Sequence, residues 1–96
     1  MKVRLIVHGI VQGVGYRDFV RSVAKKHGIV GSVRNVSDGS VEIVAVGDEE
    51  SILELEKEIK VNERYGVQVM QVDRLEQDSA AGAEYKDFRI EKDRKL

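Results

Sequence analysis

The fold is decided by the stretch GSVRNVSDGSVEIVAV, residues 31–46. Its two halves, 31–36 and 41–46, are rich in β-branched residues, which favour strands. Ser37-Asp38-Gly39-Ser40 separates them, and the Asp38-Gly39 pair suits the positive φ angles of a tight hairpin turn. This stretch therefore predicts a β-hairpin in the middle of the chain.

On the N-terminal side, a strand and a helix are predicted before the hairpin. Val3, Leu5 and Val7 alternate with other residues, a period-2 pattern typical of a strand, here ending at Gly9. From residue 16 to residue 27 the spacing becomes helical, and Gly28 can adopt the left-handed conformation that ends a helix. The residues at helical spacing are Tyr16, Phe19, Val20, Val23, Ala24 and His27.

On the C-terminal side, a second helix and two strands are predicted. Asp48 can cap a helix whose apolar stripe is Ile52, Leu55 and Ile59 and which fades near Lys60. Residues 67–72 read as a strand whose apolar phase slips once, which indicates either a bulge or two partly buried faces. Residues 77–84 read as a loop, 85–90 as a short strand with Phe88 and Ile90 on one face, and 91–96 as a solvated charged tail.

This order of elements indicates the fold class. Strand, helix and strand occur twice, which packs most simply as an open antiparallel sheet with both helices on one face. We therefore expect an α+β ferredoxin-like sandwich, β-α-β-β-α-β, with a short extra edge strand. A single domain over residues 1–92, followed by a charged tail at 93–96, accounts for the length.

Composition excludes several function classes. Sixteen basic and seventeen acidic residues give a net charge of −1, which argues against a nucleic-acid binder that depends on dense phosphate contacts. No cysteine is present, so disulfides, thiolate zinc sites and cysteine nucleophiles are excluded. No apolar run reaches the roughly 20 residues that span a bilayer. We expect a cytoplasmic monomer without nucleic-acid or membrane partners.

The segment GIVQGVGYR, residues 9–17, connects the first strand to the first helix. Gly13 and Gly15 allow the backbone to curl so that several N–H groups point inward at the start of a helix, which favours an anion. Arg17 would add a full positive charge that can bind phosphate or carboxylate. The same glycines also fit a plain tight turn with an exposed Arg17. A dinucleotide fingerprint and a P-loop are both excluded by the residues that follow.

Asn35 is a second candidate, because asparagine is a poor strand former and here stands near the end of a predicted strand. Its amide can orient a water molecule, although it cannot deprotonate one. Alternatively, Asn35 starts the turn by bonding to its own backbone. The two histidines, His8 and His27, lie in different elements without a metal-ligand spacing, so no metal site is predicted.

These residues resemble the acylphosphatase family. VHGIVQGVGYR, residues 7–17, is similar to the first signature of that family. The second signature is matched by Gly31-Ser32-Val33-Arg34-Asn35, then Gly39-Ser40-Val41, then Gly47. The resemblance covers essentially the whole domain. Two positions depart from the family pattern: Tyr16 stands where phenylalanine is commonest, and Ser32 where an aromatic residue is usual.

The resemblance implies hydrolysis of acyl phosphates to a carboxylate and inorganic phosphate. By position, Arg17 corresponds to the phosphate-binding arginine and Asn35 to the asparagine that orients water. The phosphate-binding backbone corresponds to Gln12, Gly13, Val14, Gly15, Tyr16 and Arg17. No cofactor and no metal are implied. The expected ligands are a small acyl phosphate as substrate and inorganic phosphate as product and competitive ligand.

Other function classes stay open on the sequence. A regulatory or binding module would hold phosphate or carboxylate at the same loop without turnover. An appended domain of a larger carbamoyl-transferring assembly would share the motifs. An RNA-binding sheet is the least favoured, because aromatic residues make up only 5% of the chain.

Overall fold

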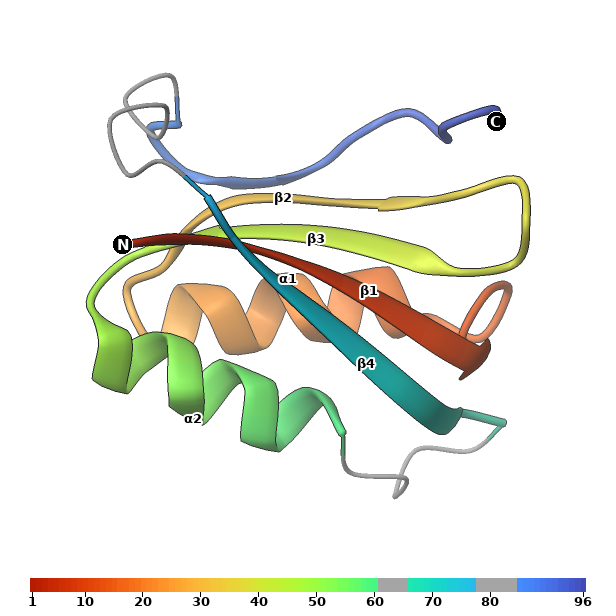
Figure 1. The fold of residues 1–96 in the computed structure, drawn as a ribbon, viewed down its shortest axis with the longest axis horizontal. Helices are drawn as coiled ribbons and strands as arrows, with labels where there is room; N and C mark the ends of the chain where they lie inside the picture. Colours follow the sequence, from red (N-terminus) through yellow and green to blue (C-terminus); the bar gives the residue numbers. More distant parts are fainter. Residues whose placement is uncertain (61–65, 78–84) are drawn as a thin grey trace.

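The computed structural model describes residues 1–60, 66–77 and 85–96. Its elements are β1 (Lys2–Ile10), α1 (Tyr16–Lys26), β2 (Val30–Asn35), β3 (Val41–Val46), α2 (Glu49–Ile59), β4 (Gln68–Gln77) and β5 (Phe88–Ile90). The strands form one sheet in the order β4-β1-β3-β2-β5, with both helices packed against the same face (Figure 1). The predicted α+β ferredoxin-like sandwich is confirmed.

The sheet departs from the antiparallel pattern at one edge. The pairs β1–β3, β1–β4 and β2–β3 are antiparallel, whereas β5 runs parallel to β2. The predicted bulge is present as well, because the register between β1 and β4 shifts at His8 and Gly9 and leaves Met70 outside the pairing. β1 therefore continues past Gly9, where the sequence predicted its end, to Ile10.

The central hairpin forms as predicted, but its turn differs in detail. Gly39 has a φ of 95°, while Asp38 does not have a positive φ. Asp38 instead accepts two hydrogen bonds at Oδ1, from Ser40 N at 2.9 Å and from Ser40 Oγ at 2.6 Å. These bonds lower the pKa of the Asp38 carboxyl. The turn thus needs one left-handed residue, and the aspartate contributes through its side chain.

Both helices begin and end close to the predicted residues. In α1, Gly28 follows the His27 cap with a φ of 68°, the left-handed conformation that was expected. In α2, Asp48 is the N-cap, and its side chain accepts a hydrogen bond from Ser51 N at 2.8 Å. Each helix buries its apolar stripe against the sheet. The core consists of Val3, Leu5, Val7, Val11, Tyr16, Val20, Val23, Ala24, Ile29, Val33, Val41, Ile43, Ala45, Ile52, Leu55, Ile59, Val67 and Phe88.

The C-terminal part differs most from expectation. β4 extends to Gln77, beyond the predicted strand at 67–72, because an edge strand can alternate charged residues outside the core. The rest of the predicted loop, 78–84, lies outside the described residues. β5 is shorter than predicted. The tail at 91–96 is mostly exposed, as expected of a solvated segment, but its backbone also hydrogen-bonds to β2 and to the turn after it.

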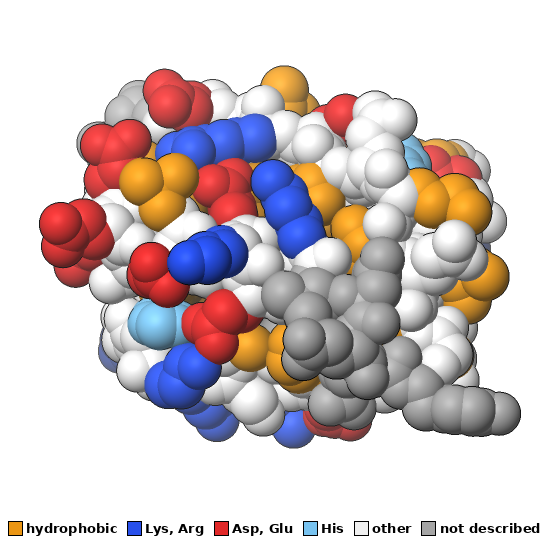
Figure 2. Space-filling view, turned by 90° about the horizontal axis from the view of Figure 1, so that it is seen from below, with side chains coloured by type: hydrophobic (Ala, Val, Ile, Leu, Met, Phe, Trp, Pro, Cys, Tyr) orange, Lys and Arg blue, Asp and Glu red, His pale blue; other side chains and the backbone are white. Residues whose placement is uncertain are grey.

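Charges of both signs are interspersed on the face seen in Figure 2. Among the ion pairs of the protein are Arg74 with Glu56 at 3.2 Å and Lys26 with Glu58. Such mixing gives this face no large field of one sign.

Candidate active site

The joint between β1 and α1 curls through two left-handed glycines. Gly13 has a φ of 73° and Gly15 a φ of 77°. Gly15 is also the N-cap of α1, and no side chain caps this helix end. The helix begins with a hydrogen bond from Phe19 N to Gly15 O at 3.2 Å. Such a joint favours glycine, because most side chains are strained at positive φ.

This curl leaves a row of backbone donors without protein acceptors. Within the described residues, none of the backbone N–H groups from Gln12 to Asp18 donates to the protein. The positive end of the α1 dipole lies at the same place. Unsatisfied N–H groups at a helix N-terminus form a site for an anion. The backbone predicted to bind phosphate therefore has the required free donors.

A cavity of about 130 Å³ opens onto this joint. It is lined by Val11, Gly13, Gly15, Tyr16, Arg17, Asp18 and Ile90. The Arg17 side chain is 38% exposed, and its Nη1 lies 3.4 Å from Asp93 Oδ1. Asp18 at the rim is engaged by Arg21 at 2.9 Å. The cavity thus combines backbone donors and a guanidinium with a partly apolar wall.

Two side chains of the predicted phosphate-binding loop serve the fold. Gln12 Nε2 donates to Val36 O at 2.7 Å and to Ser40 O at 2.8 Å, which fastens the loop to the hairpin turn. Tyr16 is buried in the core and its hydroxyl donates to Ile59 O at 2.9 Å. Burial raises the pKa of Tyr16, so the phenol stays protonated as a donor. These two residues can therefore contribute only their backbone N–H groups to the anion site.

Asn35 ends β2 near the turn to which Gln12 is bonded. It shares a face of the sheet with Val33, the face covered by the helices, because side chains alternate along a strand. Its Oδ1 is buried and accepts no hydrogen bond from the described residues. Buried acceptors are rarely left unpaired, so this atom is suited to a small donor such as water. Asn35 does not line the cavity at Arg17, although Gln12 ties the two regions together.

Ser32, the departure from the family pattern, lies on the other face of β2 from Asn35. Its partner across the strand pair is Val44, and it is 3% exposed. Ser32 is three residues before Asn35, and because side chains alternate between the two faces of a strand, the two side chains lie on opposite faces. The small serine therefore does not change the contacts of the Asn35 side chain on the helix-covered face.

The contact of Asp93 with Arg17 was not predicted from the sequence. Asp93 lies in a run of charged residues that carries no apolar periodicity, so no signal in the sequence placed it beside Arg17. The histidines are engaged elsewhere: His8 Nε2 lies 3.0 Å from Asp73 Oδ2, and His27 pairs with Glu58. In the described part of the chain, no group of three or more metal-ligating side chains is present. Neither helix of that part is long and apolar enough to cross a membrane.

Comparison with known proteins adds independent evidence. The family model "Acylphosphatase" matches residues 3–90. An acylphosphatase of Pasteurella multocida is 41% identical over 90 residues, covering 94% of this chain and 97% of that protein. The crystal structure of acylphosphatase from Bacillus subtilis superposes with a TM-score of 0.86 at 37% identity, covering 94% of this chain and 97% of that one.

A larger protein contains a similar unit. Full-length HypF, in its phosphate- and nucleotide-bound form, matches with a TM-score of 0.85 at 36% identity. The match covers 98% of this chain and 12% of that protein. Family membership and fold together support hydrolysis of acyl phosphates as the activity. With its signature loop, its free backbone donors and its match over residues 3–90, this chain belongs to the acylphosphatase family.

Proposed function

We propose that this chain hydrolyses the carboxyl-phosphate anhydride of a small acyl phosphate, without a metal ion, by direct attack of water. The observation that carries the proposal is the row of backbone N–H groups from Gln12 to Asp18, which have no acceptor among the described residues and lie beside the Arg17 guanidinium. Donors fixed by the fold in this way bind the charge of a phosphoryl group without having to reorganise.

The roles follow from charge and position. The N–H groups of Gln12, Gly13, Val14, Gly15, Tyr16 and Arg17 hold the terminal phosphoryl oxygens, and the Arg17 side chain adds its full positive charge. Asn35 orients a water molecule through its unpaired Oδ1. The water oxygen bonds to phosphorus as the bond between phosphorus and the acyl oxygen breaks, and the carboxylate leaves with the electron pair.

A carboxylate leaving group is a weak base, so no general acid has to protonate it. This fits the placement of the two histidines, which do not line the cavity and pair with Asp73 and Glu58. We propose that the proton of the attacking water passes to a phosphoryl oxygen of the substrate. We then expect kcat to be constant between about pH 6 and 7, because the rate does not depend on the protonation of an imidazole or a comparable base.

The decisive experiment measures phosphate release from benzoyl phosphate with a chelator present throughout. Arg17→Ala and Asn35→Ala should each lower kcat/KM by about 10²-fold or more, Arg17→Ala the more strongly because binding is lost as well. Lys25→Ala is the matched control, since this exposed lysine lies on the same helix and does not line the cavity. It should retain wild-type activity.

Two results would contradict the proposal. Activity that the chelator abolishes and a divalent ion restores would contradict metal independence. A wild-type protein that shows no turnover, while inorganic phosphate raises its melting temperature, would make the loop a phosphate-binding module instead. Inorganic phosphate should otherwise act as a competitive inhibitor. We further propose that the protein acts as a cytoplasmic monomer, which sedimentation and localisation can test.

A further inference from the structure

The C-terminal segment, residues 91–96, runs along β2 and the turn that follows it (Figure 1). Glu91 N donates to Val33 O at 2.9 Å, and Arg94 N donates to Asn35 O at 2.8 Å. Ser37 N then donates to Arg94 O at 2.9 Å. The backbone of Arg94 is thus hydrogen-bonded through its N–H to Asn35 and through its carbonyl to Ser37.

Asn35 is consequently held between two chain segments. On one side it pairs with Val41 of β3, and on the other it accepts the bond from Arg94. Within the described residues, no hydrogen bond fixes its side-chain amide, whose oxygen is buried and unpaired. The direction of that amide therefore depends on how firmly the backbone at residue 35 is placed.

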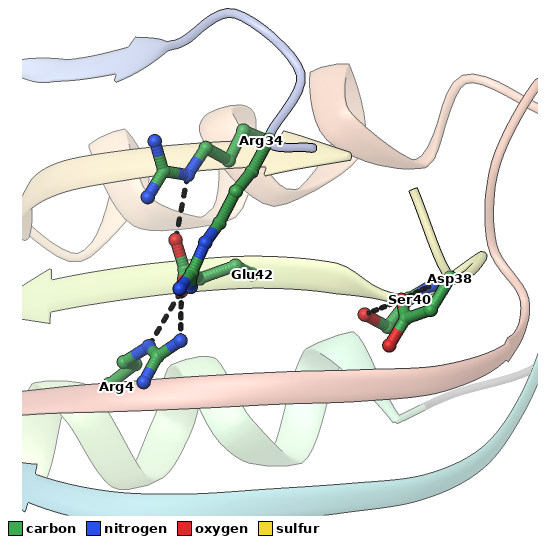
Figure 3. A network of polar contacts seen from close by, with 6 residues as sticks. Arg4, Arg34, Asp38, Ser40 and Glu42 are labelled. Carbon is green, nitrogen blue, oxygen red and sulfur yellow. Dashed lines mark hydrogen bonds and ion pairs between the residues drawn. The ribbon is translucent and has the colours of Figure 1, made fainter. Parts of the chain in front are cut away.

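The side chain of Arg94 fixes this segment to the open face of the sheet. Its Nη1 donates to Glu42 Oε2 at 2.9 Å. Glu42 also accepts from Arg34 Nε at 2.7 Å and from Arg4 Nε at 2.6 Å (Figure 3). The Glu42 side chain is 4% exposed. Without Arg94 the buried carboxylate would still have two arginine partners, so the sheet should tolerate the loss.

We propose that Arg94 is a positioning residue for Asn35. Its ion pair with Glu42 holds the C-terminal segment in place, and the segment's backbone then fixes the end of β2 from which the Asn35 amide projects. This inference rests on the proposed function, in which Asn35 orients the attacking water. Asp93, the preceding residue, brings the same segment within 3.4 Å of Arg17.

The test compares Arg94→Met with Arg4→Met in the full chain. Both variants remove one arginine from Glu42, but only Arg94 bonds to Asn35. Arg94→Met should lower kcat with benzoyl phosphate about 10-fold, because a misplacement of about 1 Å can cost up to about 10²-fold. KM and the Kd of inorganic phosphate should change little. Arg4→Met should keep wild-type kcat, and Arg94→Lys should restore most of it.

A second readout does not depend on turnover. In Arg94→Met, hydrogen exchange at the backbone amide of residue 94 should become faster, and the NMR signals of the Asn35 side-chain amide should shift. In Arg4→Met both should stay as in the wild type. Equal loss of kcat in Arg94→Met and Arg4→Met would overturn the proposal, since the effect would then be general destabilisation. Faster exchange at Arg94 with unchanged kcat would overturn it too.

If the wild type shows no turnover, the proposed function fails, and the NMR comparison still decides on Arg94. A shift of the Asn35 signals in Arg94→Met alone supports the positioning role. Unchanged Asn35 signals contradict it.

Discussion

The two joints at which a strand leads into a helix differ, although they occupy equivalent places in the two halves of the fold. Before α2, Asp48 caps the helix with its own carboxylate, which accepts from Ser51 N at 2.8 Å. Before α1, the N-cap is Gly15, with a φ of 77° and no side-chain cap. One joint supplies its own anion, whereas the other offers free donors.

This difference separates a structural helix start from a candidate binding site. An N-terminus that is satisfied by its own side chain has less to offer a ligand. The joint before α1 keeps its donors free. It is stabilised instead by side-chain hydrogen bonds, from Tyr16 to α2 and from Gln12 to the hairpin turn. Four predictions test this contrast.

The largest effect is expected when the open joint is given an anion of its own. Gly15→Asp places a carboxylate at the free donors of α1, in a residue type that tolerates the left-handed conformation. We expect kcat/KM with benzoyl phosphate to fall about 10²-fold or more, because the carboxylate competes with the phosphoryl group. Steady-state kinetics and calorimetric titration with inorganic phosphate measure the effect.

Gly15→Asn is the matched control for this change. It has the same shape and the same backbone requirement but no charge, so it should lose clearly less activity and phosphate affinity than Gly15→Asp. Equal losses in the two variants would mean that backbone strain, and not competition for the donors, explains the effect.

The next effect concerns the support behind the open joint. Tyr16→Phe removes the hydroxyl that donates to Ile59 O at 2.9 Å, and no other donor to this carbonyl is found among the described residues. The free energy of unfolding should fall by about 1–3 kcal/mol, while kcat/KM stays close to wild type. Urea denaturation measures the change, with Tyr85→Phe as the control. A loss of activity without a loss of stability would show that this hydroxyl matters to the site.

A smaller effect is expected at the self-capped joint. Asp48→Ala removes the cap of α2 and should cost about 1 kcal/mol of stability. In a domain of this size that lowers Tm by about 4–8 °C. Asp48→Asn retains a capping oxygen and should remain close to wild type. Phosphate affinity should be unchanged in both, and a weakened affinity would contradict the separation of the two joints.

The smallest effect is expected from acid at the same joint. The hydrogen bond from Ser51 N lowers the pKa of Asp48 below its usual 3.8. Its contribution to stability is therefore fully present above that value and is lost as the pH falls through the lower pKa of the folded protein. Asp48→Asn should show a shallower loss of stability between about pH 4 and 2. If the free energy of unfolding falls equally with pH in the wild type and in Asp48→Asn, the carboxyl of Asp48 is not the group responsible.

Much of this contrast could be predicted from local sequence. A capping aspartate before Glu49 and Glu50 indicates a self-capped helix, and Gly13 with Gly15 before Arg17 indicates a curled joint with free donors. Both signals lie within a few residues of the structure that they specify. The hairpin at 31–46 was predictable for the same reason, since its pattern and its turn are local.

The contacts of the C-terminal segment could not be predicted in this way. They are made by backbone groups of a charged stretch that lacks apolar periodicity, and they depend on a parallel pairing with β2. The ion pairs of Glu42 require β1, β2, β3 and the C-terminal segment to meet, which no single stretch specifies. The length of β4 was underestimated because its outer residues are exposed and polar.

The C-terminal segment also has a consequence for solubility. β5 pairs with β2 only from Gly31 to Val33, so the outer edge of β2 beyond Val33 would otherwise present free N–H and C=O groups to other molecules. Such edges invite strands of neighbouring chains to add on and start aggregation. The segment 91–96 covers this edge with charged residues of both signs, which a further strand would have to desolvate before it could add on.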